Sequence, residues 1–287
     1  MSMLVCMRTY SLDDVHETRK RRDSWWTVYF VDPVACRVAL PVANRTRITP
    51  NGLTVLSLVL GVASAVCFAT NQLVAGAAVF YLSFMIDCVD GKIARLKGTG
   101  TPFGLWLDYV GDRIRVVLCA AGLAYGQYAL TGEVGYVVLG AAVAVLDLFR
   151  YVNAPQMKRV REAVRDERQG VAHGTAEPLG PALEAMEPLD EDTQPLERAP
   201  RSSGFFRRLN RFLARHRVRS HLISGIEFHA AVFVIAPLAG AWALIPLAAA
   251  AGVLLLVNEV FLVYRMWRFT RRHAVASSRE SREHVLV

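Results

Sequence analysis

The chain has 287 residues, of which 53% are hydrophobic, and its mean hydropathy is +0.29. This apolar content excludes a disordered chain, and it is too high for an ordinary soluble domain of this length. The 33 Lys and Arg residues outnumber the 25 Asp and Glu residues, so the composition predicts a membrane protein whose cations are separated from its apolar runs.

The N-terminal arm, residues 1–23, is charged, and an apolar stretch with aromatic residues at its start follows it. A membrane span through Trp25 to Ala43 would put Asp32 and Arg37 near the middle of the bilayer, at a cost of about 2.5–3.5 kcal/mol for each charge. We therefore expect residues 24–48 to form an amphipathic helix that lies in the membrane interface, with its aromatic side chains at headgroup level.

Six later segments are apolar enough for a membrane span, which needs roughly 20 mostly apolar residues. Prolines and a glycine between residues 237 and 246 divide the last apolar stretch into a helical hairpin. The sequence therefore predicts an all-α integral membrane protein, with six transmembrane helices preceded by the N-terminal interfacial helix. The expected spans cover residues 51–70, 73–90, 104–130, 134–153, 222–243 and 245–266.

A long insert, residues 154–220, separates the fourth and fifth expected spans. Its middle part is rich in prolines and acidic residues, which favours a flexible linker. Between Phe205 and Arg215, apolar residues recur at helical spacing among arginines, which predicts a basic amphipathic helix on an anionic membrane surface. Because this basic patch adjoins two spans, we expect membrane lipids and no nucleic acid as its partners. The predicted divisions are 1–23, 24–48, 49–153 with a motif at 87–112, 154–220, 221–267, and a cytoplasmic tail at 268–287.

The cations predict the orientation in the membrane. All 33 lie before the first expected span, in the 91–103 loop, in the insert, in the C-terminal tail, or in the helix ends that adjoin them. With six spans, all of these segments lie on one side, which the positive-inside rule makes cytoplasmic, with both termini inside. The high Ala and Arg content favours a bacterial source, so we expect a multi-pass protein of a bacterial inner membrane.

Four aspartates recur at helical spacing. Asp87 and Asp90 are three residues apart, and they share one face of a helix. Asp108 and Asp112 are four residues apart and share a face of the next helix. The turn from Gly98 to Pro102 lets these two faces oppose each other. Four carboxylates brought together need a counter-charge, and all-oxygen ligands suit Mg²⁺, Mn²⁺ or Ca²⁺.

Small residues on the same two stripes leave room for a ligand to approach the backbone, and Arg95 can neutralise phosphate there. These small residues are Gly91, Ala94 and Gly104. The pattern therefore predicts a metal and phosphate site at the membrane boundary. Intramembrane carboxylates also mark ion pathways, so a cation- or proton-coupled membrane transporter is the alternative.

The same residues resemble the signature of the CDP-alcohol phosphotransferase (CDP-alcohol phosphatidyltransferase) family, D-x-x-D-G-x-x-A-R-x8-G-x-x-x-D-x-x-x-D. A second family-like feature is T-P-N-G-L-T at the start of the first span, where Thr49 is expected to be the N-cap and Pro50 the first helical residue. The similarity extends over about residues 45–155. The signature is matched at every fixed position, by Asp87, Asp90, Gly91, Ala94, Arg95, Gly104, Asp108 and Asp112.

The resemblance implies a reaction in phospholipid synthesis. A CDP-linked donor, usually CDP-diacylglycerol, gives its phosphatidyl group to an alcohol hydroxyl, and CMP leaves. The resemblance also implies a homodimer, two Mg²⁺ or Mn²⁺ ions, and Asp112 as the general base. The implied metal ligands are Asp87, Asp90, Asp108 and Asp112. The implied nucleotide and donor contacts are Asn51, Thr54, Gly91, Ala94, Arg95, Thr101 and Gly104.

The acceptor is a small polar alcohol. A phosphorylated acceptor needs additional cations, for which Arg113, Arg150 and Lys158 are the candidates, although each of them can also anchor the chain to lipid headgroups. Arg150 lies three residues after Asp147 and can pair with it. The pair Asp112–Arg113 looks like that of members that use inositol phosphate, so we expect a phosphorylated polyol such as inositol phosphate. Serine, glycerol phosphate and other polyols stay open.

Overall fold

The computed structural model describes residues 9–173, 208, 215–218 and 224–285, and the side chains of 165–173 and 272–285 are left out of the description. Within these ranges the chain is helical, and no β-strand occurs beyond an isolated bridge between Asp23 and Val218. The elements are α1 (Leu12–Glu17), the π-helical segment η1 (Thr27–Val31), α2 (Asp32–Arg45), α3 (Pro50–Ala69), α4 (Leu73–Lys97), α5 (Pro102–Thr131), α6 (Val134–His173), α8 (Gly225–Ala230), the π-helical segment η2 (Ala231–Ile235), α9 (Ala236–Ala239) and α10 (Ala241–Val285).

Five helices are long and apolar enough to cross a membrane, which confirms the prediction of a helical integral membrane protein. They are Pro50–Ala69, Leu73–Lys97, Pro102–Thr131, Val134–Val164 within α6, and Ala241–Arg271 within α10. The remaining expected span, 222–243, coincides with the apolar run Gly225–Ala239, which α8, η2 and α9 form and which is shorter than the other five. The total of six spans therefore stays a prediction.

The bundle is centred on α3, which packs against both α4 and α5. Two glycines of α5 make this approach possible, because a side chain at Gly122 or Gly126 would overlap the backbone carbonyl of Ala65 or Phe68 in α3. Gly140 of α6 packs in the same way against Ala120 and Ala124 of α5. These glycines therefore serve the packing of helices within one copy of the chain.

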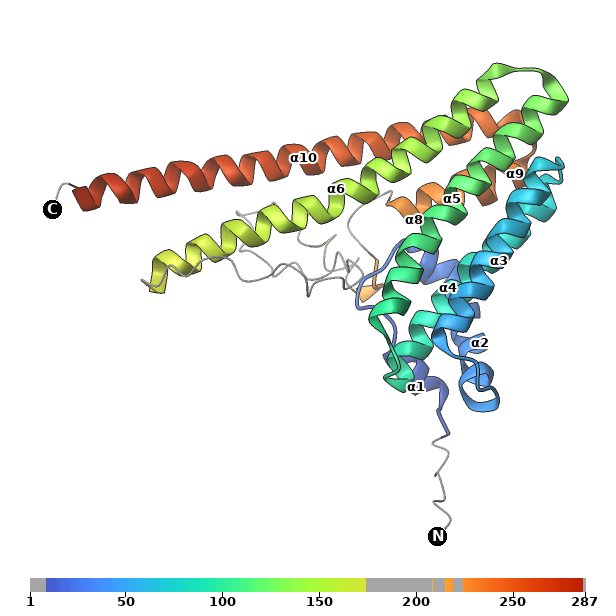
Figure 1. Ribbon diagram of the computed structural model, residues 1–287, viewed down its shortest axis with the longest axis horizontal. Helices are drawn as coiled ribbons and strands as arrows, with labels where there is room; N and C mark the ends of the chain where they lie inside the picture. Colours follow the sequence, from blue (N-terminus) through green and yellow to red (C-terminus); the bar gives the residue numbers. More distant parts are fainter. Residues whose placement is uncertain (1–8, 174–207, 209–214, 219–223, 286–287) are drawn as a thin grey trace, which may run out of the picture.

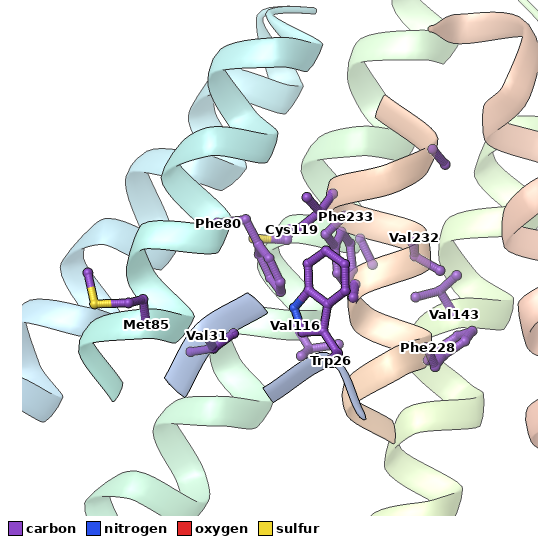
Figure 2. Packing of buried hydrophobic residues seen from close by; sticks show 14 of the residues in the cluster. Trp26, Val31, Phe80, Met85, Val116, Cys119, Val143, Phe228, Val232 and Phe233 are labelled. Atoms are coloured by element: carbon purple, nitrogen blue, oxygen red, sulfur yellow. The ribbon is translucent and has the colours of Figure 1, made fainter. Parts of the chain in front are cut away.

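Aromatic and aliphatic side chains from helices far apart in the sequence meet in the middle of the molecule (Figure 2). Phe80 of α4 and Phe233 of η2 lie with their ring centroids 4.8 Å apart. Val116 and Cys119 of α5 are buried in the same cluster, as is Trp26, which directly precedes η1. This core ties the segments before and after the insert to the helices that carry the aspartate motif.

The region 24–48 contains η1 and α2, and α2 packs against α4. Of the two charges that argued against a span here, Asp32 is neutralised inside the protein and Arg37 is exposed. Asp32 is buried, with Lys92 Nζ 2.7 Å from its Oδ1 and Arg217 Nη1 3.4 Å from its Oδ2. We call Asp32, Lys92 and Arg217 the balanced cluster. The location of α2 in the membrane interface stays a prediction.

Helices α6 and α10 extend together away from the other helices, to the left in Figure 1. The expected fourth span stops at residue 153, but α6 continues through Pro155 as far as His173. The linker and the basic amphipathic helix that we expect between residues 170 and 215 lie almost entirely outside the described residues.

Candidate active site

The signature aspartates of α4 and α5 meet where these two helices approach each other. Asp87, Asp90 and Asp108 each place a carboxylate oxygen within 4.8 Å of the other two. We call these three residues the carboxylate cluster. Asp90 is buried, while Asp87 and Asp108 are half-buried. Like charges this close repel unless a cation is shared among them, and the all-oxygen donor set fits Mg²⁺ or Mn²⁺.

Capping residues end α4 and begin α5, so that the two helices can approach each other. Gly98 ends α4 with a left-handed φ of 62°, which glycine adopts without a steric penalty. Thr101 then caps α5 by accepting a hydrogen bond from the Gly104 N–H at 3.0 Å, and Pro102 is the first residue of the helix. The chain therefore reverses within a few residues, and the facing of the two aspartate pairs predicted from their spacing is confirmed for three of the four residues.

The third helix, α3, supplies hydroxyl groups to this cluster. Thr54 Oγ1 donates to Asp90 Oδ2 at 2.6 Å, and Ser57 Oγ donates to Asp87 Oδ1 at 3.2 Å. Thr54, for which a nucleotide contact stays a prediction, is buried and faces a carboxylate. Ser57 was missed, although its spacing of three residues from Thr54 puts both hydroxyls on one face of α3.

Asp112 stands apart from the three grouped carboxylates and is held by arginines. Arg115 Nη2 donates to Asp112 Oδ1, and Arg115 Nη1 lies 3.4 Å from Asp87 Oδ1. Arg115 therefore bridges the fourth aspartate to the cluster. Its stem passes across Gly61 of α3, where any side chain would collide with it. The sequence did not predict this bridge, because the path of Arg115 between helices has no signature in residue spacing.

Three of the predicted nucleotide contacts come together where α3 and α5 begin. Asn51 Nδ2 donates to Thr101 Oγ1 at 3.4 Å, and a side chain at Gly104 would overlap the Asn51 amide. Arg95 is exposed on α4, next to Gly91, and its Nε donates to the Thr18 carbonyl at 2.8 Å, which ties it to the N-terminal arm. Ala94, the residue before Arg95, is half-buried.

Two of the three predicted acceptor contacts meet at a residue of α6. Arg113 Nη1 donates to Asp147 Oδ2, and Arg150 Nη2 lies 3.7 Å from Asp147 Oδ1. The Arg150–Asp147 pair expected from the spacing is confirmed. Lys158 lies elsewhere, in an exposed ion pair with Glu162 at 3.8 Å.

Residues 47–169 match the sequence model of CDP-alcohol phosphatidyltransferase, a range that includes the whole carboxylate cluster, Asp112 and Asp147. The chain therefore contains a CDP-alcohol phosphatidyltransferase domain. This domain begins just before α3 and ends within the last turns of α6.

Two curated proteins are similar to part of this chain. Archaetidylinositol phosphate synthase of Methanothermobacter thermautotrophicus is 32% identical over 105 residues, which are 36% of this chain and 50% of that protein. Phosphatidylinositol phosphate synthase of Mycobacterium tuberculosis is 39% identical over 82 residues, which are 27% of this chain and 38% of that protein. The chain thus spans half or less of the length of these curated relatives.

A solved structure of Mycobacterium tuberculosis phosphatidylinositol phosphate synthase, in complex with manganese and citrate, superposes with a TM-score of 0.47 at 21% identity. The superposition covers 83% of this chain and 89% of that one.

Proposed function

We propose that this protein is a membrane-embedded enzyme of phospholipid synthesis, which transfers a phosphatidyl group from a CDP-linked donor to the hydroxyl of a small polar alcohol and releases CMP. CDP-diacylglycerol is the proposed donor. The observation that carries the proposal is the carboxylate cluster, because three carboxylates within 4.8 Å of one another lie inside the matched phosphatidyltransferase domain.

The proposed cofactor is Mg²⁺ or Mn²⁺, as two ions held by the carboxylate cluster together with Asp112. Bound there, the ions would neutralise the donor's diphosphate and stabilise CMP as the leaving group. The hydroxyl groups of Thr54 and Ser57 hold two of the ligand carboxylates in place. Such outer partners orient metal ligands and tune their affinity.

Asp112 is the proposed general base. It takes the proton of the acceptor hydroxyl while the hydroxyl oxygen forms a bond to the phosphorus that carries the diacylglycerol. The bond from that phosphorus to the bridging oxygen breaks, and CMP leaves with this oxygen. The side chain of Asp112 is 26% exposed, so an acceptor from water can reach it, and Arg115 and Arg113 orient its two oxygens.

The donor contacts proposed from the family signature are Asn51, Thr54, Gly91, Ala94, Arg95, Thr101 and Gly104. The proximity of Asn51, Thr101 and Gly104 supports a shared surface for the nucleotide. The proposed acceptor is inositol phosphate, which is favoured by the names of the relatives and by Arg113, which lies beside Asp112 and shares Asp147 with Arg150. Lys158 has no comparable support.

In the membrane, we propose six spans with Gly225–Ala239 as part of the fifth, the interfacial helix at 24–48, and both termini in the cytoplasm of a bacterial cell. Many large apolar side chains of α6 and α10 are exposed in the isolated chain, which supports contact with lipid acyl chains. A homodimer is proposed from the family resemblance.

The test is CMP release by the purified full chain in lipid nanodiscs that contain CDP-diacylglycerol. With Mn²⁺ or Mg²⁺ and inositol phosphate, we expect CMP and a new phospholipid that lipid mass spectrometry identifies, and chelation of the metal should stop both. The absence of CMP with a full panel of acceptor alcohols would overturn the proposal. Ion flux in liposomes without nucleotide binding would instead support the transporter alternative.

A further inference from the structure

Asp147 of α6 is a fully buried carboxylate outside the family signature, and its side chain has a relative exposure of 0%. It faces residues of α5, α6 and α8: Arg113, Arg150 and His229 all direct side-chain nitrogens at it. A buried carboxylate is costly unless it is paired and hydrogen-bonded, so this arrangement is held by its partners.

On the side of the carboxylate cluster, Arg113 is fixed in three ways. Its Nη1 donates to Asp147 Oδ2, and its Nη2 lies 3.6 Å from Asp112 Oδ2. Its guanidinium also stacks on the Tyr151 ring, with the central carbon 3.8 Å from the ring centroid. Arg113 therefore lies between the buried Asp147 and the proposed general base.

On the other side, Asp147 reaches the helix that follows the insert. His229 Nε2 of α8 lies 2.7 Å from Asp147 Oδ1, and Arg150 Nη2 lies 3.7 Å from the same oxygen. Arg150 packs directly on the backbone of Gly225, the first residue of α8, where a side chain would overlap its guanidinium. Asp147 thus joins the two arginines to each other through a single carboxylate.

The guanidinium groups around Asp147 keep free donor capacity for an anion. Arg113 and Arg150 face the buried carboxylate of Asp147, and Arg115 pairs with Asp112, which Arg113 also faces. Arg150 is 22% exposed. The Nε atoms of Arg113 and Arg150 have no hydrogen-bond partner within the part of the chain that the structure describes. Guanidinium groups are well suited to phosphate because their donors form a rigid planar fork.

We propose that Asp147 is a positioning residue, which holds Arg113 and Arg150 side by side as a subsite for the phosphate of a phosphorylated acceptor alcohol. The proposal rests on the proposed function and narrows its acceptor class. Without Asp147, the two arginines repel each other and lose their common anchor, so they no longer present their donors together.

The experiment compares the full-length wild type with Asp147→Asn in two assays. The first measures binding of inositol phosphate by calorimetry without donor, and the second measures kcat and KM for CMP release with inositol phosphate or with inositol. In Asp147→Asn we expect the Kd and the KM for inositol phosphate to rise about tenfold or more, as for the loss of a hydrogen bond to a charged group. The KM for CDP-diacylglycerol and the kinetics with inositol should stay within about twofold.

Asp32→Asn is the matched control, because Asp32 is equally buried and also faces two cationic groups. This variant should leave the binding of inositol phosphate unchanged. His229→Gln provides a second route if Asp147→Asn does not fold, since it removes the imidazole contact and leaves the charge of Asp147 in place. It should raise the KM for inositol phosphate by a smaller factor than the asparagine variant.

A role of Asp147 through its charge and a role through positioning predict opposite changes in the affinity for inositol phosphate. If Asp147 acts only through its negative charge, its removal strengthens the binding of inositol phosphate, and the proposal is wrong. Equal losses with inositol and inositol phosphate would also overturn it, because they indicate a purely structural role. Wild-type protein that binds inositol phosphate without releasing CMP would contradict the proposed function and leave the subsite standing. CMP release by the wild type, together with unchanged binding of inositol phosphate in Asp147→Asn, would support the proposed function and overturn the subsite.

Discussion

The carboxylate cluster and the balanced cluster both involve α4, and they are built in opposite ways. Asp90 and Lys92 are only two residues apart, which turns them to opposite sides of the helix. Lys92 faces Asp32 in a buried ion pair at 2.7 Å, and Arg217 adds a second cation to the same carboxylate. On the other side, three carboxylates crowd together, and the nearest cation, Arg115, contacts only Asp87 among them.

This difference distinguishes charges that stabilise the fold from charges that bind a ligand. In the balanced cluster, the protein itself supplies the counter-charges, and the ion pairs join α2 to α4 and to the end of the insert. In the carboxylate cluster, the repulsion among the three carboxylates is reduced when a cation binds, so the cluster favours divalent cations. The sign of a substitution's effect on stability should therefore differ between the two clusters.

The largest effect is expected at Asp112. Asp112→Asn should lower kcat for CMP release by about 10²–10⁴-fold, because the acceptor hydroxyl loses its general base. Thermal stabilisation by CDP-diacylglycerol with Mn²⁺ measures donor binding in parallel, and because Asp112 is also a proposed metal ligand, kcat should fall by a larger factor than the donor affinity. An activity loss below about tenfold in this variant would remove Asp112 from the role of base.

The next prediction contrasts stability between the two clusters. Lys92→Met should destabilise the protein by roughly 3–5 kcal/mol, because it leaves Asp32 buried with an incomplete set of partners. Asp108→Asn should raise the thermal midpoint of the metal-free protein, because it removes one of three repelling carboxylates. Unfolding in detergent, followed by tryptophan fluorescence with a chelator present, measures both changes. If both midpoints fell together, the distinction between the clusters would fail.

The smallest effect is expected at the hydroxyl groups of α3. Thr54→Val removes the hydrogen bond to Asp90, and it should weaken Mn²⁺ binding by about 10–100-fold, as is common for outer partners of metal ligands. Ser64→Ala is the control on the same helix, because Ser64 is equally buried and donates to the Gly76 carbonyl. Titration with Mn²⁺ should leave the affinity of this control unchanged.

The sequence predicts what repeats along one helix and misses what crosses between helices. Helical spacing within α4 and within α5, with a short turn between them, predicted four converging carboxylates, of which three meet in the carboxylate cluster. The pairing of Arg150 with Asp147 followed from the same spacing rule. Ser57 and His229 reach their partners from other helices, 30 and 82 residues away. No fixed spacing links such residues, so only the packed structure brings them together.

In the fold as well, the sequence predicts features that are continuous along the chain and misses those that depend on packing between helices. Hydropathy predicted six spans, and five of them correspond to helices that are long enough to cross a membrane, because each is a continuous apolar run. The run Gly225–Ala239 was expected to reach residue 243, but it ends at Gly240, whose backbone has a φ of 106°. Composition also counted Asp32 as a charge in lipid, whereas the packing of α2 on α4 supplies it with Lys92.

The central claim is that the carboxylate cluster holds a divalent cation and the balanced cluster does not. Electron paramagnetic resonance of Mn²⁺ titrated into the metal-free protein tests it directly. We predict that the wild type and Asp32→Asn bind Mn²⁺ with similar affinity and that Asp108→Asn loses this binding. Absent Mn²⁺ binding in the wild type, or equal losses in the two variants, would contradict the account.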